Sequence, residues 1–140
     1  MKKQKKIYQK LFQRKMQKDL NKIAKDTNLF FKNFIKKQKK SELIIPMKYG
    51  LFSGGKKIRS KILMDISSLF KLDYRTSISL GAAVECIHAY SLIHDDLPCM
   101  DNDTIRRGKP STHIKFGEST AVLAGNSLLT MAFEILSKKN

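Results

Sequence analysis

The sequence predicts an all-α protein, and three observations support that prediction. Apolar residues recur at helical spacing along most of the chain, and no stretch alternates with period two for long enough to make a convincing strand. Glycine and proline, which interrupt helices, number only 7 and 3 among 140 residues. Hydrophobic residues make up 41% of the chain, which is typical of one globular domain with a core rather than of a disordered chain.

Residues 3–37 are predicted to form one or two amphipathic helices. Lysines fill the gaps between apolar residues on the expected core side, which are Phe12, Met16, Leu20, Ile23 and Ala24. The segment 26–28 (Asp-Thr-Asn) either interrupts this helix or caps a second one with its own apolar residues, Phe30, Phe31, Phe34 and Ile35. The lysine-rich residues 36–40 stand where a helix C-terminus favours positive charge.

The next segments are shorter. Residues 42–49 are apolar and contain Pro46, and residues 50–55 are glycine-dense and predicted to be a loop. A helix should follow this loop, with one apolar side expected to face the core: Ile58, Ile62, Leu63, Ile66, Leu69 and Phe70. Residues 72–74 are predicted to be a turn.

The most apolar part of the chain is residues 76–94. Because it lacks a polar face, it is predicted to be a buried central helix. Residues 100–117 are polar and predicted to be turn-rich. A last helix is predicted from about Ser119 to Leu136, with a core side made of Ala121, Val122, Leu128, Met131, Ala132, Ile135 and Leu136.

The formal net charge of +16 comes mostly from one end of the chain. Residues 1–40 hold 15 Lys or Arg against 2 Asp or Glu, and 23 of the 28 basic residues in the whole chain are lysine. Sites that recognise phosphate or bases usually use more arginine, whose planar fork binds them bidentately. The pattern favours a solvated lysine face over a basic interaction tail, and no nucleic-acid partner is predicted.

Cysteine usage and hydropathy bear on location. Cys86 and Cys99 form neither a CxxC motif nor a zinc spacing, which indicates a reducing compartment. No apolar stretch of signal-peptide type follows the basic N-terminus, and no run is apolar enough for a membrane span. The sequence therefore predicts a cytoplasmic location and no membrane span.

Four carboxylates follow the buried helix within nine residues. They are Asp95, Asp96, Asp101 and Asp103. Carboxylates this close repel one another unless a cation neutralises them. Since all the donors are oxygen, the expected cation is hard, and Mg²⁺ fits because it binds through one or two carboxylates together with substrate phosphates.

Basic residues stand on both sides of this acidic cluster. Arg106, Arg107 and Lys109 follow it, and Gly54-Gly55-Lys56-Lys57-Ile58-Arg59 precedes it at the start of a predicted helix. Glycines let a backbone approach an anion, although this is not a P-loop. Each cluster alone is more often a cap or a solvated turn, but their combination favours a magnesium–diphosphate site.

The residues from Glu85 to Asp103 resemble the first aspartate-rich motif (DDxxxxD in its bacterial form) of the trans-prenyl diphosphate synthases. The Arg106-Arg107 pair, the GGKxxR segment at 54–59, and residues 113–118 and 121–129 continue the resemblance. It covers residues 40–137 and is most like bacterial farnesyl diphosphate synthases. It implies a partial isoprenoid-synthase helical bundle at 41–140, preceded by a lysine-rich amphipathic helical region at 1–40.

The resemblance implies a role for individual residues. Asp95, Asp96 and Asp101 would bind the Mg²⁺ ions that bridge an allylic diphosphate, and Arg106 would contact that diphosphate. Isopentenyl diphosphate would be held by four residues, Lys56, Arg59, His88 and Arg107. Tyr90, the fifth residue before Asp95, would limit the product to farnesyl length, with simple core packing as its alternative role. The family ionises the allylic substrate, and the isopentenyl double bond then attacks head to tail.

The resemblance also sets expectations for the whole protein. Family members are about twice as long as this chain and dimeric. Their second motif, DDxxD, is expected in the half not present here, so catalysis by this chain alone should be severely impaired. Three alternatives remain open: a geranylgeranyl diphosphate synthase, a non-catalytic partner subunit of a prenyl synthase, and a basic nucleic-acid-binding helical protein. The aspartate cluster argues against the last.

Overall fold

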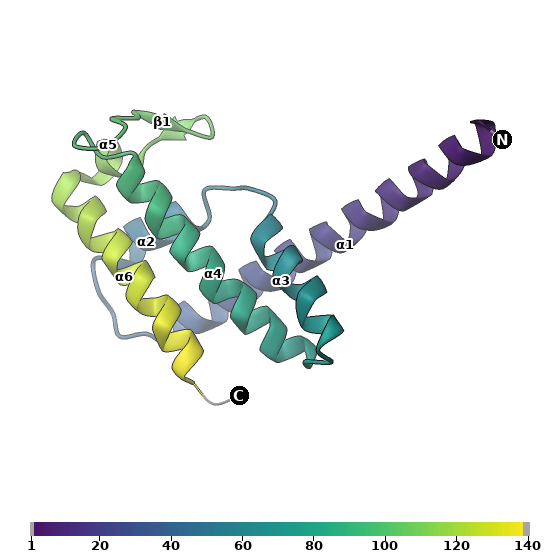
Figure 1. The fold of residues 1–140 in the computed structure, drawn as a ribbon. Coiled ribbons are helices and arrows are strands. Elements are labelled where there is room, and N and C mark those ends of the chain that lie inside the picture. Colours follow the sequence, from purple (N-terminus) through teal and green to yellow (C-terminus); the bar gives the residue numbers. More distant parts are fainter. Residues whose placement is uncertain (1, 139–140) are drawn as a thin grey trace.

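A long central helix organises the structure, a computed structural model that describes residues 2–138 (Figure 1). The described elements are, in chain order, α1 Lys2–Lys36, α2 Ile44–Leu51, α3 Ile58–Leu69, α4 Tyr74–Asp95, β1 Ile105–Arg106, β2 Lys109–Pro110, α5 Thr112–Phe116 and α6 Glu118–Ser137. The prediction of an all-α fold is confirmed, with the two-residue strands as the one exception within 2–138.

The core lies where α4 meets its neighbours. α4 runs alongside α6 and also packs against α1, α2 and α3 (Figure 1). The main cluster of buried side chains comes mostly from α1, α2, α4 and α6 and includes Phe31, Leu51, Ala82, Cys86, Ile93, Leu128 and Ile135. α4 is buried on several sides, as its lack of a polar face predicts.

α4 and α6 are also long and apolar enough to cross a membrane, judged by length and composition alone. However, 56% and 39% of their apolar windows are buried inside the protein. The core helix of a soluble protein passes the same test. The described helices therefore give only weak support for a span.

α1 is one uninterrupted helix, so residues 26–28 neither break it nor cap a second helix. Thr27 is fully buried within it because that side of α1 lies on the core. The expected core side was wrong at Phe12 and Met16, which are exposed because the N-terminal half of α1 projects beyond the other helices (Figure 1). Contact with the core begins near Ile23.

The segment before the glycine-rich loop is helical as far as Leu51. Gly50, expected in the loop, lies in α2 instead, where a Cβ would stand 2.5 Å from Cδ1 of Ile93. The absence of a side chain there lets α2 approach α4. Pro46 is tolerated because it lies in the first helical turn, where its missing N–H has no partner to lose.

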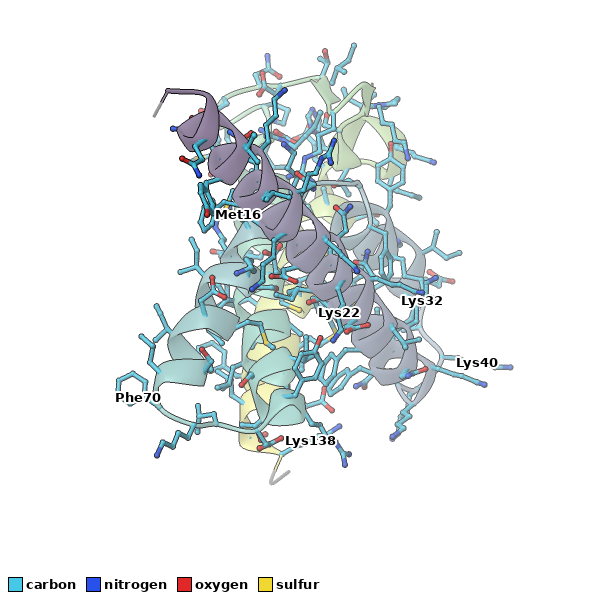
Figure 2. All side chains as sticks on the ribbon, turned by 90° about the vertical axis from the view of Figure 1, so that its right-hand side faces the viewer. Met16, Lys22, Lys32, Lys40, Phe70 and Lys138 are labelled. Carbon is cyan, nitrogen blue, oxygen red and sulfur yellow. The ribbon has the colours of Figure 1, made fainter. Side chains whose placement is uncertain are left out.

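The orientation predicted for α3 was wrong. Its buried residues are Ser60, Met64 and Ser67, while Ile62 and Ile66 are exposed and Phe70 is 75% exposed at the edge of the molecule (Figure 2). The reason is a close helix contact. Ser60 Oγ donates to the carbonyl of Gly81 on α4 at 3.1 Å, so small residues form the interface and the larger apolar residues face outward.

Three further details differ from the sequence prediction. Tyr74 begins α4 rather than ending a turn, because the Asp73 side chain caps the helix by accepting from the Thr76 N–H at 3.0 Å. Residues 100–117 contain the β1–β2 hairpin and α5 as well as turns. On α6, Val122 and Leu136 are exposed rather than in the core.

Candidate functional site

A pocket at the start of α3 brings together residues from three separate parts of the chain. Its lining includes Lys56 from the glycine-rich loop, Arg59 from the first turn of α3, His88 from α4 and Arg107 from the hairpin turn. Each of these residues was implied by the resemblance to hold isopentenyl diphosphate. The structure thus places the four side chains around one space, with the positive N-terminal end of α3 beside them.

The loop that supplies Lys56 depends on two glycines. Gly54 and Gly55 have φ of 105° and 98°, where a residue with a Cβ is strained. Arg107 Nη1 donates to the Gly54 carbonyl, and a Cβ on Gly55 would stand 2.5 Å from the same nitrogen. The glycines therefore allow both the turn of the loop and the close approach of the arginine.

A buried ion pair holds this loop in place. Lys57 Nζ lies 3.7 Å from Oε2 of Glu85 and donates to the carbonyl of Leu51 at 3.0 Å. Glu85 Oε1 accepts from the Ser60 N–H at 3.2 Å, in the first turn of α3. The pair links α2, α3 and α4, and so fixes where the loop leaves one helix and enters the next.

Sequence analysis assigned no role to Lys57 or Glu85. A signal was nevertheless present, because a glutamate on an otherwise apolar helix requires a positively charged partner. The sequence did not say which of the neighbouring lysines, Lys56 or Lys57, supplies it. In the structure Lys57 turns inward from a left-handed backbone (φ 51°), and Lys56 remains exposed at the pocket.

The electrostatics of the pocket favour an anion. The pKa of His88 is lowered, mainly because burial disfavours the imidazolium and further because Arg59, Arg107 and Lys57 are close. Glu85 opposes this shift in part. The negative charge of a bound diphosphate would offset the repulsion between these positive side chains and would favour the protonated His88 ring.

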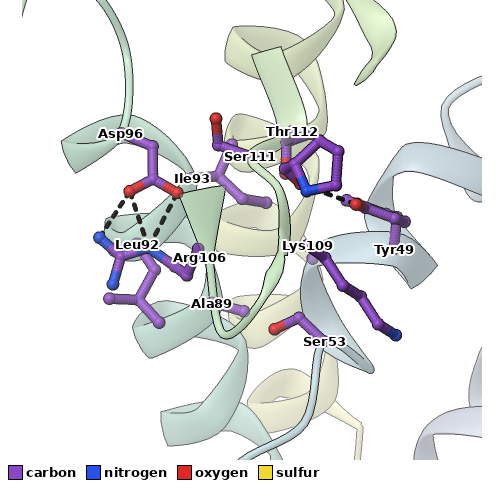
Figure 3. Close-up of a pocket in the computed structure, with 12 residues that line it drawn as sticks. Tyr49, Ser53, Ala89, Leu92, Ile93, Asp96, Arg106, Lys109, Ser111 and Thr112 are labelled. Carbon is purple, nitrogen blue, oxygen red and sulfur yellow. Dashed lines mark hydrogen bonds and ion pairs between the residues drawn. The ribbon is translucent and has the colours of Figure 1, made fainter. Parts of the chain in front are cut away.

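A second pocket, which adjoins the first and shares Ala89 and Leu92 with it, is lined by residues of the hairpin and of α4 (Figure 3). Its polar centre is Asp96, which is 2% exposed and accepts from Arg106 Nε at 2.7 and 2.8 Å. Arg106 Nη2 also lies 2.5 Å from Asp96 Oδ1 and 3.4 Å from Oδ2 of Asp103. These bonds raise the pKa of Arg106, with Asp96 as the main cause.

The two neighbouring arginines of the hairpin line different pockets, Arg106 the second and Arg107 the first. Arg106 ends β1, and Arg107 with Gly108 makes the two-residue turn, with φ of 53° and 74° as in a type I′ turn. Tyr49 Oη holds the hairpin to α2 by donating to the Pro110 carbonyl at 2.7 Å (Figure 3). Arg106 therefore reaches the aspartates, while Arg107 reaches the glycine-rich loop.

The aspartates cluster at the C-terminal end of α4. Asp95 is half-buried and Asp101 is exposed, and the Asp101 N–H donates to the Asp95 carbonyl at 2.8 Å. Within residues 2–138, no three His, Cys, Asp or Glu side chains form a ready-made metal cluster. The donor chemistry still fits Mg²⁺, because this ion needs only one or two carboxylates when water and phosphate supply the rest.

Carboxylates at a helix C-terminus also face the negative end of the helix dipole. Arg106 offsets this for Asp96, and no described residue forms an ion pair with Asp95 or Asp101. An added cation would therefore be favoured beside those two side chains.

Tyr90 lies elsewhere on α4. Its half-buried ring packs on the main core and stands 4.6 Å from the His94 ring in an edge-to-face arrangement. His94 Nε2 in turn lies 3.1 Å from the Val122 carbonyl on α6. The structure thus shows packing for Tyr90, and its effect on product length stays a prediction.

In the described residues, a helical bundle places a cationic pocket beside a carboxylate cluster, an arrangement whose charges suit an anion and a divalent cation. Comparison with known proteins identifies a family with this helical fold. The family model described as polyprenyl synthetase matches residues 40–140, so the chain belongs to the polyprenyl synthetase family.

Individual relatives differ in the product that their names give. The farnesyl diphosphate synthase of Buchnera aphidicola (subsp. Acyrthosiphon pisum) is 54% identical over 98 residues, which are 70% of this chain and 35% of the relative. The large subunit 1 of the chloroplastic heterodimeric geranylgeranyl pyrophosphate synthase from Arabidopsis thaliana is 52% identical over 91 residues, or 65% of this chain and 24% of the relative.

A solved structure shows the same fold. The apo FPP/GFPP synthase from Zymomonas mobilis has a TM-score of 0.80 and 41% identity, covering 85% of this chain and 44% of the other. The chain thus spans about a third of the Buchnera relative and less than half of this structural neighbour.

Proposed function

We propose that the protein is a prenyltransferase of isoprenoid biosynthesis. It would condense isopentenyl diphosphate head to tail with dimethylallyl or geranyl diphosphate, giving farnesyl diphosphate. The observation that supports this most is the convergence of Lys56, Arg59, His88 and Arg107 on one pocket. The proposal concerns the whole protein, of which this chain contains the glycine-rich loop and the first aspartate cluster.

In this proposal the pocket at the start of α3 binds isopentenyl diphosphate. Lys56, Arg59 and Arg107 would neutralise the charge of the diphosphate. His88, whose lowered pKa favours the neutral ring, would donate a hydrogen bond and add no positive charge to the empty pocket. Arg107 is already positioned by the Gly54 carbonyl, so it loses little freedom on binding.

The allylic diphosphate would bind at the C-terminal end of α4, beside the second pocket, whose lining includes Asp96 and Arg106 but neither Asp95 nor Asp101. Asp95, Asp96 and Asp101 would hold Mg²⁺ there, and Arg106, oriented by Asp96, would contact the diphosphate oxygens. The metal would supply electrostatic stabilisation of the departing diphosphate. Because the two arginines diverge from one hairpin, the two diphosphates would be held at a fixed separation.

Three further properties belong to the proposal. Tyr90 would limit chain length to farnesyl. The protein would be cytoplasmic. It would form a homodimer, supported by exposed apolar side chains on α6 such as Leu123 and Phe133. The same exposed face would also suit a non-catalytic partner subunit, which is the second candidate function.

Substrate binding tests the proposal most directly. We expect isothermal titration calorimetry to detect isopentenyl diphosphate binding to the 140-residue chain, and Arg59→Gln to weaken it by about tenfold or more because a charge-assisted hydrogen bond is lost. Arg14→Gln is the matched control, since Arg14 is an exposed arginine on α1 outside the pocket. A folded chain with no affinity, or equal losses in both variants, would contradict the proposal.

Activity is the second measurement. With Mg²⁺, geranyl diphosphate and isopentenyl diphosphate, this chain alone should form farnesyl diphosphate only weakly, because it lacks the DDxxD motif, and Asp95→Ala should abolish what it forms. If the parent chain and the Asp95→Ala variant formed product equally, Asp95 would have no part in the mechanism. If the chain makes no product alone but changes the rate of a full-length synthase added to it, the partner-subunit function is favoured.

A further inference from the structure

The N-terminal half of α1 extends beyond the folded body (Figure 1). Every side chain described between residues 4 and 19 is exposed, and the first buried one is Ile23. At 1.5 Å per residue, residues 2–19 make a free helix about 25 Å long. The family match begins at residue 40, so membership of the family assigns no role to this helix.

The free helix has two different faces. At 100° per residue, one face presents five apolar side chains that are 51–68% exposed, namely Ile7, Tyr8, Leu11, Phe12 and Met16. The opposite face presents Lys10, Gln13, Arg14 and Gln17, and Gln9 lies at the border beside Met16. Lys15 and Lys18 lie within the apolar face, and their long stems let the ammonium groups reach outward. Residues 1–18 contain eight basic residues and no acidic one. The helix is therefore both amphipathic and strongly cationic.

Little within the chain stabilises this segment. A helix of this length without tertiary contacts is marginal in water, and like charges four residues apart, such as Lys10 with Arg14, repel. The one side-chain hydrogen bond described nearby joins Gln17 to Asn21 at 2.8 Å. A partner that covers the apolar face and neutralises the lysines would stabilise the helix on both counts.

We propose that residues 2–18 form an amphipathic helix that binds the surface of an anionic phospholipid bilayer. Such helices lie in the membrane interface with aromatic and aliphatic residues inserted and lysines towards the headgroups. Each basic residue near an anionic leaflet adds to the attraction. The long lysine stems can reach the headgroups while the apolar face is buried.

Charge and apolarity favour this partner over two others. A second copy of the same helix would bring the same positive charge to the contact, so self-association is opposed. Nucleic acid would neutralise the lysines but would leave Phe12 and Leu11 in water. An anionic bilayer would bury the apolar side chains and neutralise the basic ones at the same time.

The test is co-sedimentation of the full 140-residue chain with vesicles of phosphatidylcholine alone or mixed equally with phosphatidylglycerol. We expect at least about tenfold stronger binding to the anionic vesicles at about 0.15 M salt. The double variant Leu11→Glu/Phe12→Glu should lose at least about tenfold more binding than Gln13→Glu/Gln17→Glu. These doubles change the charge equally, in the same part of the helix but on opposite faces.

The outcomes separate the partners. No binding of the parent chain to anionic vesicles, or equal losses in the two double variants, would overturn the proposal. So would a chain that prefers duplex DNA to these vesicles. Circular dichroism without vesicles checks that both variants fold, which is expected because all four positions are exposed. The result does not depend on prenyl transfer, so it stands apart from the proposed function.

Discussion

Lys57 and Glu85 form a buried ion pair that positions the residues around it. They are 8% and 3% exposed, and burial is the main cause that lowers the pKa of Lys57, with Glu85 opposing it. Their partners, the Leu51 carbonyl and the Ser60 N–H, are the ends of the loop that carries Lys56. The pair therefore helps to position the cationic pocket, whose lining includes both residues, and its two opposite charges add no net charge there.

Removing one member of this pair should be costly. We expect Glu85→Gln to lower the free energy of unfolding by about 2–4 kcal/mol, because it leaves the Lys57 ammonium buried without a counter-charge. Urea unfolding measures the change. Asp65→Asn, which removes the exposed pair with Lys61, should cost less than about 0.5 kcal/mol. A similar cost for both would mean that Lys57 is solvated.

His88 gives the pocket a pH dependence. Since its pKa in the folded chain is lowered below the ordinary 6.5, the unfolded chain takes up a proton more readily. Stability should therefore fall as pH falls below about 6.5, and His88→Gln should remove that part of the slope. Inorganic diphosphate should raise the His88 pKa, as followed by NMR titration of the ring. An unchanged pKa would contradict an anion site at His88.

At the scale of elements, a glycine sets the distance between α4 and α6. A Cβ on Gly125 would clash with Nε2 of His94. The His94 ring cannot move freely, because it also contacts the Val122 carbonyl and the Tyr90 ring. The Tyr90 ring, which was expected to control product length, is thus held in place indirectly by α6, through His94.

Filling this contact should separate the helices. We expect Gly125→Ala to lower the free energy of unfolding by about 1–2 kcal/mol, since overpacking outweighs the roughly 1 kcal/mol gained in helix propensity. Thermal unfolding is the measurement. Asn126→Ala, one residue further on an exposed position, should change stability by no more than about 0.5 kcal/mol. A stabilised Gly125→Ala would show that His94 moves without cost.

For the whole molecule, the projecting part of α1 and the helical body should be separable. Deleting residues 1–18 should leave the free energy of unfolding unchanged within about 0.5 kcal/mol, because no side chain described there is buried. Deleting residues 1–24 removes Ile23, which packs with Met64 and Ile78, and should be clearly destabilising. Circular dichroism melts compare the two. Equal losses would mean that the free helix stabilises the body.

The sequence by itself determined the all-α class, the central helix before Asp95, the glycine-rich loop and the two basic clusters. These features follow from composition and from helical periodicity, which are local properties of the chain. The resemblance to a known family added the roles of individual residues. It also named the residues of the cationic pocket, although no local pattern could show that they converge.

Only the tertiary structure decided which faces are buried. Periodicity finds an apolar side on α3, but the close approach of Ser60 to Gly81 turns that side outward. Likewise, the apolar side of α1 meets the core only from Ile23 onward, since the other helices end there. The opposite directions of Arg106 and Arg107 depend on a two-residue turn and on its contacts with distant segments. A sequence pattern records amphipathicity, whereas burial depends on which neighbour is close enough to cover the face.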